Sequence, residues 1–91
     1  MGHYVEVPNN KQKAGQLMKI YGAELTDCPA SLSEIPKDKA LICVVDNGLF
    51  EAAAFCYSDD ELHEFSQADG RPKNWMLMDL ALTKKLAGFN R

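Results

Sequence analysis

The stretch Ala40-Leu41-Ile42-Cys43-Val44-Val45-Asp46-Asn47-Gly48-Leu49-Phe50-Glu51-Ala52-Ala53-Ala54-Phe55-Cys56-Tyr57 decides the fold of this chain. Two apolar runs flank Asn47-Gly48, and Asn-Gly is the strongest short-range signal for a β-hairpin, because both central residues of a type I′ turn need a positive φ. We therefore expect a central hairpin with strands at about 40–46 and 49–57. A two-residue turn would place Val45 opposite Phe50 and Leu41 opposite Ala54.

Both faces of this hairpin are apolar. Successive side chains of a strand point to opposite faces, so Leu41 and Cys43 lie on one face and Ile42, Val44 and Phe55 on the other. Flanking helices cover one face, and the sequence leaves open what covers the face of Ile42, Val44 and Phe55. A second copy of the chain would do so, which makes a homodimer one expectation.

Three helices are expected around the hairpin. Apolar residues spaced as one helical face predict the first helix, over about 10–21; they are Ala14, Leu17, Met18 and Tyr21. Ser58, with a glutamate three residues later, forms a capping box for a helix over about 58–67. Asp79 caps the last helix, over about 79–87.

The order of these elements predicts the fold class. Short strands are expected near 3–7, 23–26 and 74–78, in addition to the hairpin. Ninety-one residues are enough for one domain. We therefore expect a single α+β domain over residues 1–91, with a small, mainly antiparallel sheet built on the central hairpin and three helices packed on it.

Composition excludes several protein classes. The chain is 46% hydrophobic and 25% charged, which is ordinary for a globular protein and argues against disorder. No apolar run approaches the roughly 18 residues that a membrane helix needs, and the N-terminus lacks the basic and apolar regions of a signal peptide. The three cysteines are odd in number and widely spaced, as in a reducing compartment. These features predict a cytoplasmic protein with no membrane partner.

Charge is distributed unevenly along the chain. Residues 40–70 contain seven acidic residues and no Lys or Arg, whereas residues 71–91 contain five basic residues and one acidic residue. The sequence pI of about 5.2 disfavours nucleic-acid binding, which calls for a strongly basic surface. An acidic surface that imitates DNA is the reverse alternative.

Catalytic patterns are scarce. The chain has no phosphate-binding glycine loop and no zinc-type ligand spacing. We therefore predict no catalytic residues, no metal site and no cofactor. A small enzyme with a thiol-dependent activity centred on Cys28 is the alternative, although the adjacent Asp27 opposes the thiolate that such an enzyme needs. The sequence favours a non-enzymatic protein.

Four residues near the last predicted strand are of the types enriched at contact surfaces. They are Arg71, Trp75, Met76 and Met78. The plainer interpretation places Trp75 and the methionines in the core. On the first interpretation, the protein is an interaction or regulatory protein that acts by protein–protein contact, with a protein partner or by self-association.

The same region carries a resemblance to a known group of proteins. The segment Asp69-Gly70-Arg71-Pro72-Lys73-Asn74-Trp75-Met76-Leu77-Met78-Asp79, with the following Lys-rich helix that ends Leu86-Ala87-Gly88-Phe89, resembles small uncharacterised proteins of large tailed bacteriophages. The resemblance covers about a quarter of the chain. It implies an accessory protein that acts on a host or phage partner in the host cytoplasm, and it implies no catalytic residue.

Overall fold

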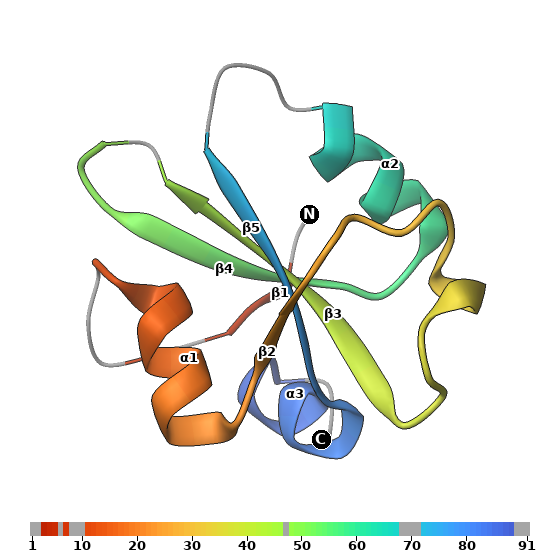
Figure 1. Ribbon diagram of the computed structural model, residues 1–91, viewed down its shortest axis with the longest axis horizontal. Helices are drawn as coiled ribbons and strands as arrows, with labels where there is room; N and C mark the ends of the chain where they lie inside the picture. The colour runs from red at the N-terminus through yellow and green to blue at the C-terminus, as the bar shows by residue number, and fades with distance from the viewer. Residues whose placement is uncertain (1–2, 6, 8–10, 47, 68–71, 89–91) are drawn as a thin grey trace.

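A computed structural model describes residues 3–5, 7, 11–46, 48–67 and 72–88 (Figure 1). In it, five strands form one sheet in the order β1-β4-β3-β5-β2, and every neighbouring pair is antiparallel. The strands are β1 (His3–Tyr4), β2 (Glu24–Thr26), β3 (Lys39–Asp46), β4 (Glu51–Cys56) and β5 (Lys73–Asp79). The helices are α1 (Lys13–Tyr21), α2 (Asp59–Gln67) and α3 (Leu80–Leu86), with a short 3-10 helix η1 (Leu32–Glu34). The α+β class and the central hairpin, here β3 and β4, are confirmed.

The turn of the hairpin differs from the prediction. Asp46 and Glu51 form the last pair of the two strands, so four residues (47–50) connect them instead of two. The Oδ1 atom of Asp46 accepts a hydrogen bond from the backbone N–H of Gly48 at 2.7 Å, and Gly48 has a φ of 90°. Such a bond from an Asp side chain to the backbone two residues on is typical of turns. Asn47 lies outside the described residues.

The longer loop shifts the register of the hairpin by two residues. Val45 lies opposite Ala52 and not opposite Phe50, and Leu41 lies opposite Cys56. Because a strand repeats every two residues, this shift leaves each side chain on its predicted face. The predicted pairs were wrong, but the predicted faces were right.

The chain itself covers both faces of the sheet. On one face, α1 and α3 pack against Ile42, Val44 and Phe55, all of which are buried. On the other face, α2 and the η1 segment pack against Leu41 and Cys43. Figure 1 shows these two groups of helices on the two sides of the strands. The face that the sequence left open therefore needs no second copy of the chain to bury it.

Local signals place the helix ends. The Oγ atom of Ser58 accepts a hydrogen bond from the Glu61 N–H at 3.2 Å, which starts α2 as the capping box predicts. A left-handed Gly22, with a φ of 70°, ends α1. The predicted buried face of α1 is correct at Leu17 and wrong at Met18, which is 42% exposed. The helix begins three residues later than predicted and buries a narrower face.

None of the helices in the described part of the chain is long and apolar enough to cross a membrane.

Candidate functional site

The four predicted contact residues do not form one surface. Met76 and Met78 are buried in the core between the sheet and the helices α1 and α3. Trp75 is half-buried on the opposite face of β5, against the residues around α2. Arg71 lies outside the described residues. Of the three that are described, only Trp75 therefore has contact area to offer a partner.

Two of the three thiols, those of Cys43 and Cys56, are buried and have the chemistry of small apolar groups. Cys28 is exposed, whereas Cys43 and Cys56 are buried, and all three are free. The register places Cys56 diagonally across from Cys43, two positions along the hairpin and not four as the two-residue turn implied. Burial raises the pKa of Cys43 to about 11 and also raises the pKa of Cys56.

Cys28 gains no activation from its surroundings. Desolvation raises the pKa of its thiol, and the nearby positive charge of Lys73 offsets this only in part. A nucleophilic cysteine needs the opposite shift. Within the described ranges, no three or more His, Cys, Asp or Glu side chains are grouped so that they could hold a metal ion.

Several acidic residues of the 40–70 segment hold the backbone in place. Each carboxylate accepts a hydrogen bond from a backbone N–H near the end of a helix or strand. The acceptor and donor pairs are Asp46 and Gly48, Glu51 and Gln12, Asp59 and Leu32, and Glu61 and Tyr57. These carboxylates therefore have structural partners within the chain.

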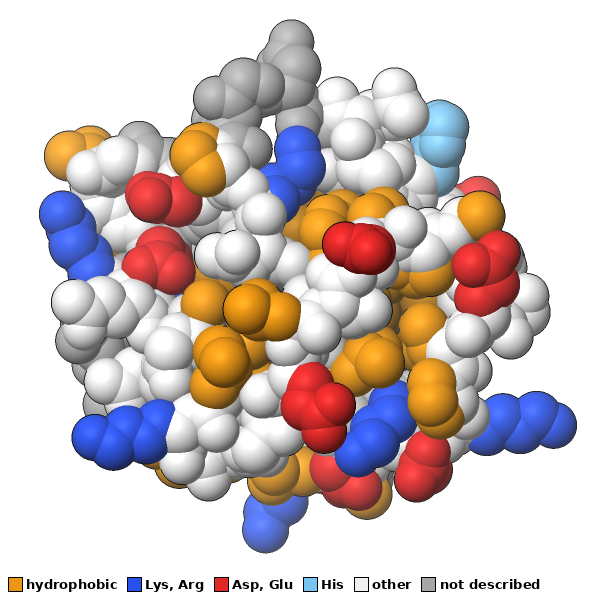
Figure 2. Space-filling model, viewed as in Figure 1, with side chains coloured by type: hydrophobic (Ala, Val, Ile, Leu, Met, Phe, Trp, Pro, Cys, Tyr) orange, Lys and Arg blue, Asp and Glu red, His pale blue; other side chains and the backbone are white. Residues whose placement is uncertain are grey.

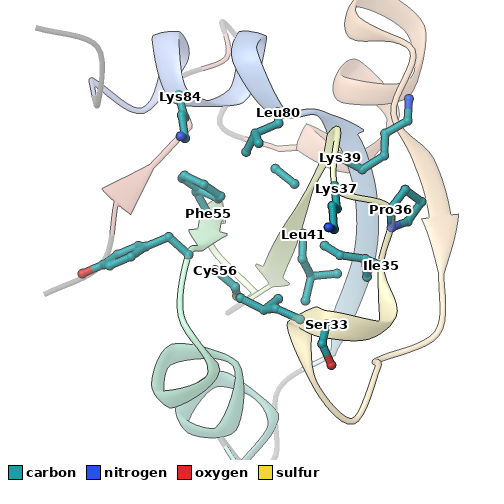
Figure 3. A pocket seen from close by; sticks show the side chains of 13 residues that line it. Ser33, Ile35, Pro36, Lys37, Lys39, Leu41, Phe55, Cys56, Leu80 and Lys84 are labelled. Atoms are coloured by element: carbon teal, nitrogen blue, oxygen red, sulfur yellow. The ribbon is translucent and has the colours of Figure 1, made fainter.

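A pocket of about 480 Å³ lies at the open end of the hairpin, opposite the loop that connects β3 to β4 (Figure 3). Leu41 of β3 and Cys56 of β4 form the outermost pair of the two strands at this end. The pocket forms because β3 begins two residues before Leu41, whereas β4 ends at Cys56 and the chain leaves the sheet at Tyr57. We call it the η1–α3 pocket, after the two elements that bound it. Its lining residues are Leu32, Ser33, Ile35, Pro36, Lys37, Lys39, Ala40, Leu41, Phe55, Cys56, Tyr57, Leu80 and Lys84.

Hydrogen bonds to the backbone position both walls of the η1–α3 pocket. On the η1 side, the carboxylate of Asp59 accepts the backbone N–H of Leu32 at 2.9 Å. On the α3 side, the carboxylate of Asp79 accepts the N–H of Leu82 at 2.9 Å, which caps the helix as predicted. The N–H of Leu80 donates to the carbonyl oxygen of Asp38 at 2.9 Å and ties α3 to the loop before β3.

The charged side chains known to line the η1–α3 pocket are basic. Of the residues that the structure describes, three lysines and no acidic residue belong to the lining. In Figure 3, Lys84 lies beside Phe55 and Leu80, Lys37 lies on the other side of the hollow, and Lys39 is turned away from it. No ion pair joins these lysines to a carboxylate in the part of the chain that the structure describes.

Other apolar side chains reach the surface elsewhere. In the loop of the hairpin, Leu49 is 79% exposed. Phe50 and Tyr4 border a second, more polar pocket of about 350 Å³. On the face drawn in Figure 2, hydrophobic side chains show over α1 and β2, where Ile20 and Leu25 are exposed, and in the hollow between β2 and η1. None of these groups combines an apolar hollow with a rim of one charge, as the η1–α3 pocket does.

Sequence reasoning missed the η1–α3 pocket. Its walls come from three segments, around residues 32–41, 55–57 and 80–84, and no spacing within one segment reveals that they meet. One of these walls contains the short helix η1, which lies between β2 and β3 in the chain. No protein-family model, no curated protein and no solved structure matches this chain.

Proposed function

We propose that this protein is a small, non-enzymatic interaction protein that acts by protein–protein contact at the η1–α3 pocket. The observation that supports this proposal is the pocket itself, an apolar hollow of about 480 Å³ that is open to solvent. That volume is within the range of roughly 300–1,000 Å³ of known ligand sites. Its walls are held by backbone hydrogen bonds, so an occupant finds the site already formed.

The chemistry of the lining favours binding over catalysis. The floor is made of aliphatic and aromatic side chains, such as Leu41, Phe55 and Leu80. The one thiol in the lining belongs to Cys56, whose pKa is raised by burial. A raised pKa keeps this thiol protonated and weakly nucleophilic. An apolar side chain of another protein is the occupant that this floor accommodates best.

Tyr57 is the residue at which a partner would gain most. It lines the pocket, and it is 43% exposed. Tyrosines of this kind contribute a large share of binding energy at protein interfaces, because they bury a large apolar ring and keep a polar end. The resemblance to bacteriophage proteins adds that the partner is to be sought among host or phage proteins.

The test compares two tyrosine variants. The chain, its Tyr57→Ala variant and its Tyr4→Ala variant are immobilised and exposed to bacterial host lysate, and the captured proteins are quantified by mass spectrometry. Tyr4 is the matched control, because it is 53% exposed and does not line the η1–α3 pocket. We expect Tyr57→Ala to reduce capture of one defined protein by about tenfold or more.

We expect Tyr4→Ala to leave capture of that protein unchanged. Circular dichroism and thermal unfolding establish that both variants fold like the parent chain. If the captured proteins are the same for all three chains, the η1–α3 pocket is not the contact site and the proposal is wrong.

A further inference from the structure

We propose that the segment of the partner that enters the η1–α3 pocket is acidic, with an apolar side chain in the hollow and carboxylates on both sides of it. This inference rests on the proposed function, since it names the chemistry of the partner at the same site. The observation behind it is that the pocket is bounded by Lys37 and Lys84 on opposite sides (Figure 3), with no acidic residue among the described residues that line it.

The two lysines come from separate elements, which sets the pattern that an occupant must match. Lys84 projects from α3, and Lys37 projects from the loop before β3. Long lysine side chains cover apolar surface with their methylene groups and keep the ammonium group in water. If an apolar residue of the partner lies in the hollow, one ammonium group is therefore near the partner's residues before it, and the other is near the partner's residues after it.

Two carboxylates near the pocket, those of Asp59 and Asp79, accept hydrogen bonds from other groups. Asp59 accepts hydrogen bonds from the Leu32 N–H at 2.9 Å and from the Ser31 hydroxyl at 3.3 Å. Asp79 accepts the Leu82 N–H at 2.9 Å. Each carboxylate is held at the start of a helical segment, where it satisfies backbone donors. Within the described residues, neither Lys37 nor Lys84 forms an ion pair with a carboxylate, so both ammonium groups can meet an incoming acidic group.

The overall charge of the protein makes this preference specific to the pocket. The net charge is −3, so the molecule as a whole repels an acidic segment. Any preference for an acidic partner must then arise from the nearby lysines. Exposed ion pairs are weak, so two of them predict affinity about two- to thirtyfold tighter for an acidic than for a neutral segment.

The test uses three blocked synthetic peptides: Asp-Asp-Phe-Leu-Asp-Asp, Asn-Asn-Phe-Leu-Asn-Asn and Lys-Lys-Phe-Leu-Lys-Lys. Each is titrated into the ¹⁵N-labelled full chain, and binding is measured from the amide shifts of Ile35, Tyr57 and Leu80. We expect the acidic peptide to bind about two- to thirtyfold more tightly than the amide peptide, and the basic peptide most weakly. Raising the ionic strength from 0.05 to 0.5 M should remove this difference, since salt screens exposed charges.

Charge variants assign the effect to the two lysines. The double variant Lys37→Gln/Lys84→Gln should bind the acidic and amide peptides equally, and Lys37→Glu/Lys84→Glu should reverse their order. The control is Lys85→Glu, because Lys85 is an exposed neighbour of Lys84 on α3 that does not line the pocket. Lys85→Glu should leave the order of the peptides unchanged.

The outcomes separate this inference from the proposed function. Equal binding of the acidic and amide peptides at the pocket overturns the acidic preference and leaves protein contact there in place. Binding of none of them, or shifts confined to other surfaces, also overturns the inference, while the tyrosine variants decide the proposed function. If the pocket amides shift with protein concentration alone, a second copy of the chain occupies the pocket and the inference is wrong.

Discussion

The carboxylate of Asp59 holds the backbone of Leu32, a residue 27 positions earlier in the chain, through a hydrogen bond of 2.9 Å between the Leu32 nitrogen and Oδ1. Asp59 is the first residue of α2, and Leu32 is the first residue of η1. This contact therefore joins two elements on the same face of the sheet. It also fixes the wall of the η1–α3 pocket that Leu32 and Ile35 provide.

Removing this carboxylate should loosen that wall. Asp59→Ala leaves the Leu32 N–H without its charged acceptor, and we expect it to lower the free energy of unfolding by about 1–2 kcal/mol. Hydrogen exchange at the Leu32 amide should accelerate, which NMR detects. Asp60→Ala is the control: Asp60 is in the same first turn, and its carboxylate has no hydrogen-bond partner in the part of the chain that the structure describes. A cost for Asp60→Ala as large as that for Asp59→Ala would show that helix-end charge matters and the bond to Leu32 does not.

Two glycines should respond to alanine in opposite directions. Gly48 has a φ of 90° in the hairpin loop, whereas Gly15 lies within α1, and a Cβ atom would meet no other atom within 4 Å at either position. Gly48→Ala should therefore cost about 1–2 kcal/mol from backbone strain alone. Gly15→Ala should stabilise the protein by about 0.5–1 kcal/mol, because alanine is the better helix former. Urea unfolding measures both, and a destabilised Gly15→Ala variant would contradict this description of α1.

Two methionines test the assignment of the core. Met76 is 0% exposed and Met18 is 42% exposed. Met76→Ala should lower the free energy of unfolding by about 2–5 kcal/mol, because it leaves a cavity between the sheet and the helices. Met18→Ala should cost less than about 1 kcal/mol. Chemical denaturation compares them directly. If Met76→Ala instead left stability unchanged and weakened partner capture, Met76 would belong to a contact surface, as its residue type first suggested.

Local patterns in the sequence were sufficient for the elements and their faces. The capping residues Ser58 and Asp79 act within one turn of themselves, so their roles follow from their neighbours alone. The alternation of Ile42 and Val44 with Leu41 and Cys43 assigns faces whatever the register, because a shift of two residues preserves it. For this reason the strands and helices were predicted correctly although the hairpin pairs were not.

Features that depend on distant segments could not be predicted in this way. The register goes with a four-residue loop, in which the carboxylate of Asp46 accepts a hydrogen bond from the Gly48 N–H. Phe55 is buried because α1 and α3 pack on its face of the sheet, and no local sequence pattern specifies on which face a helix packs. The η1–α3 pocket depends on the meeting of segments up to about 50 residues apart. Composition signals at Met76 and Met78 were ambiguous, since methionine serves both cores and contact surfaces.

The buried thiols should make the protein less stable in alkali. Folding raises the pKa of Cys43 from 9.0 to about 11, so above pH 9 the unfolded chain loses this proton first and unfolding is favoured. Below pH 9 the thiol is protonated in both states and its contribution is constant. Between about pH 9 and 11 it should destabilise the fold by roughly 1.4 kcal/mol per pH unit. Urea unfolding under reducing conditions at pH 8, 9 and 10 should therefore show the stability gap between the parent chain and Cys43→Ala narrowing above pH 9. A gap that stays constant over this range would mean that Cys43 ionises as readily in the folded protein as in the unfolded chain.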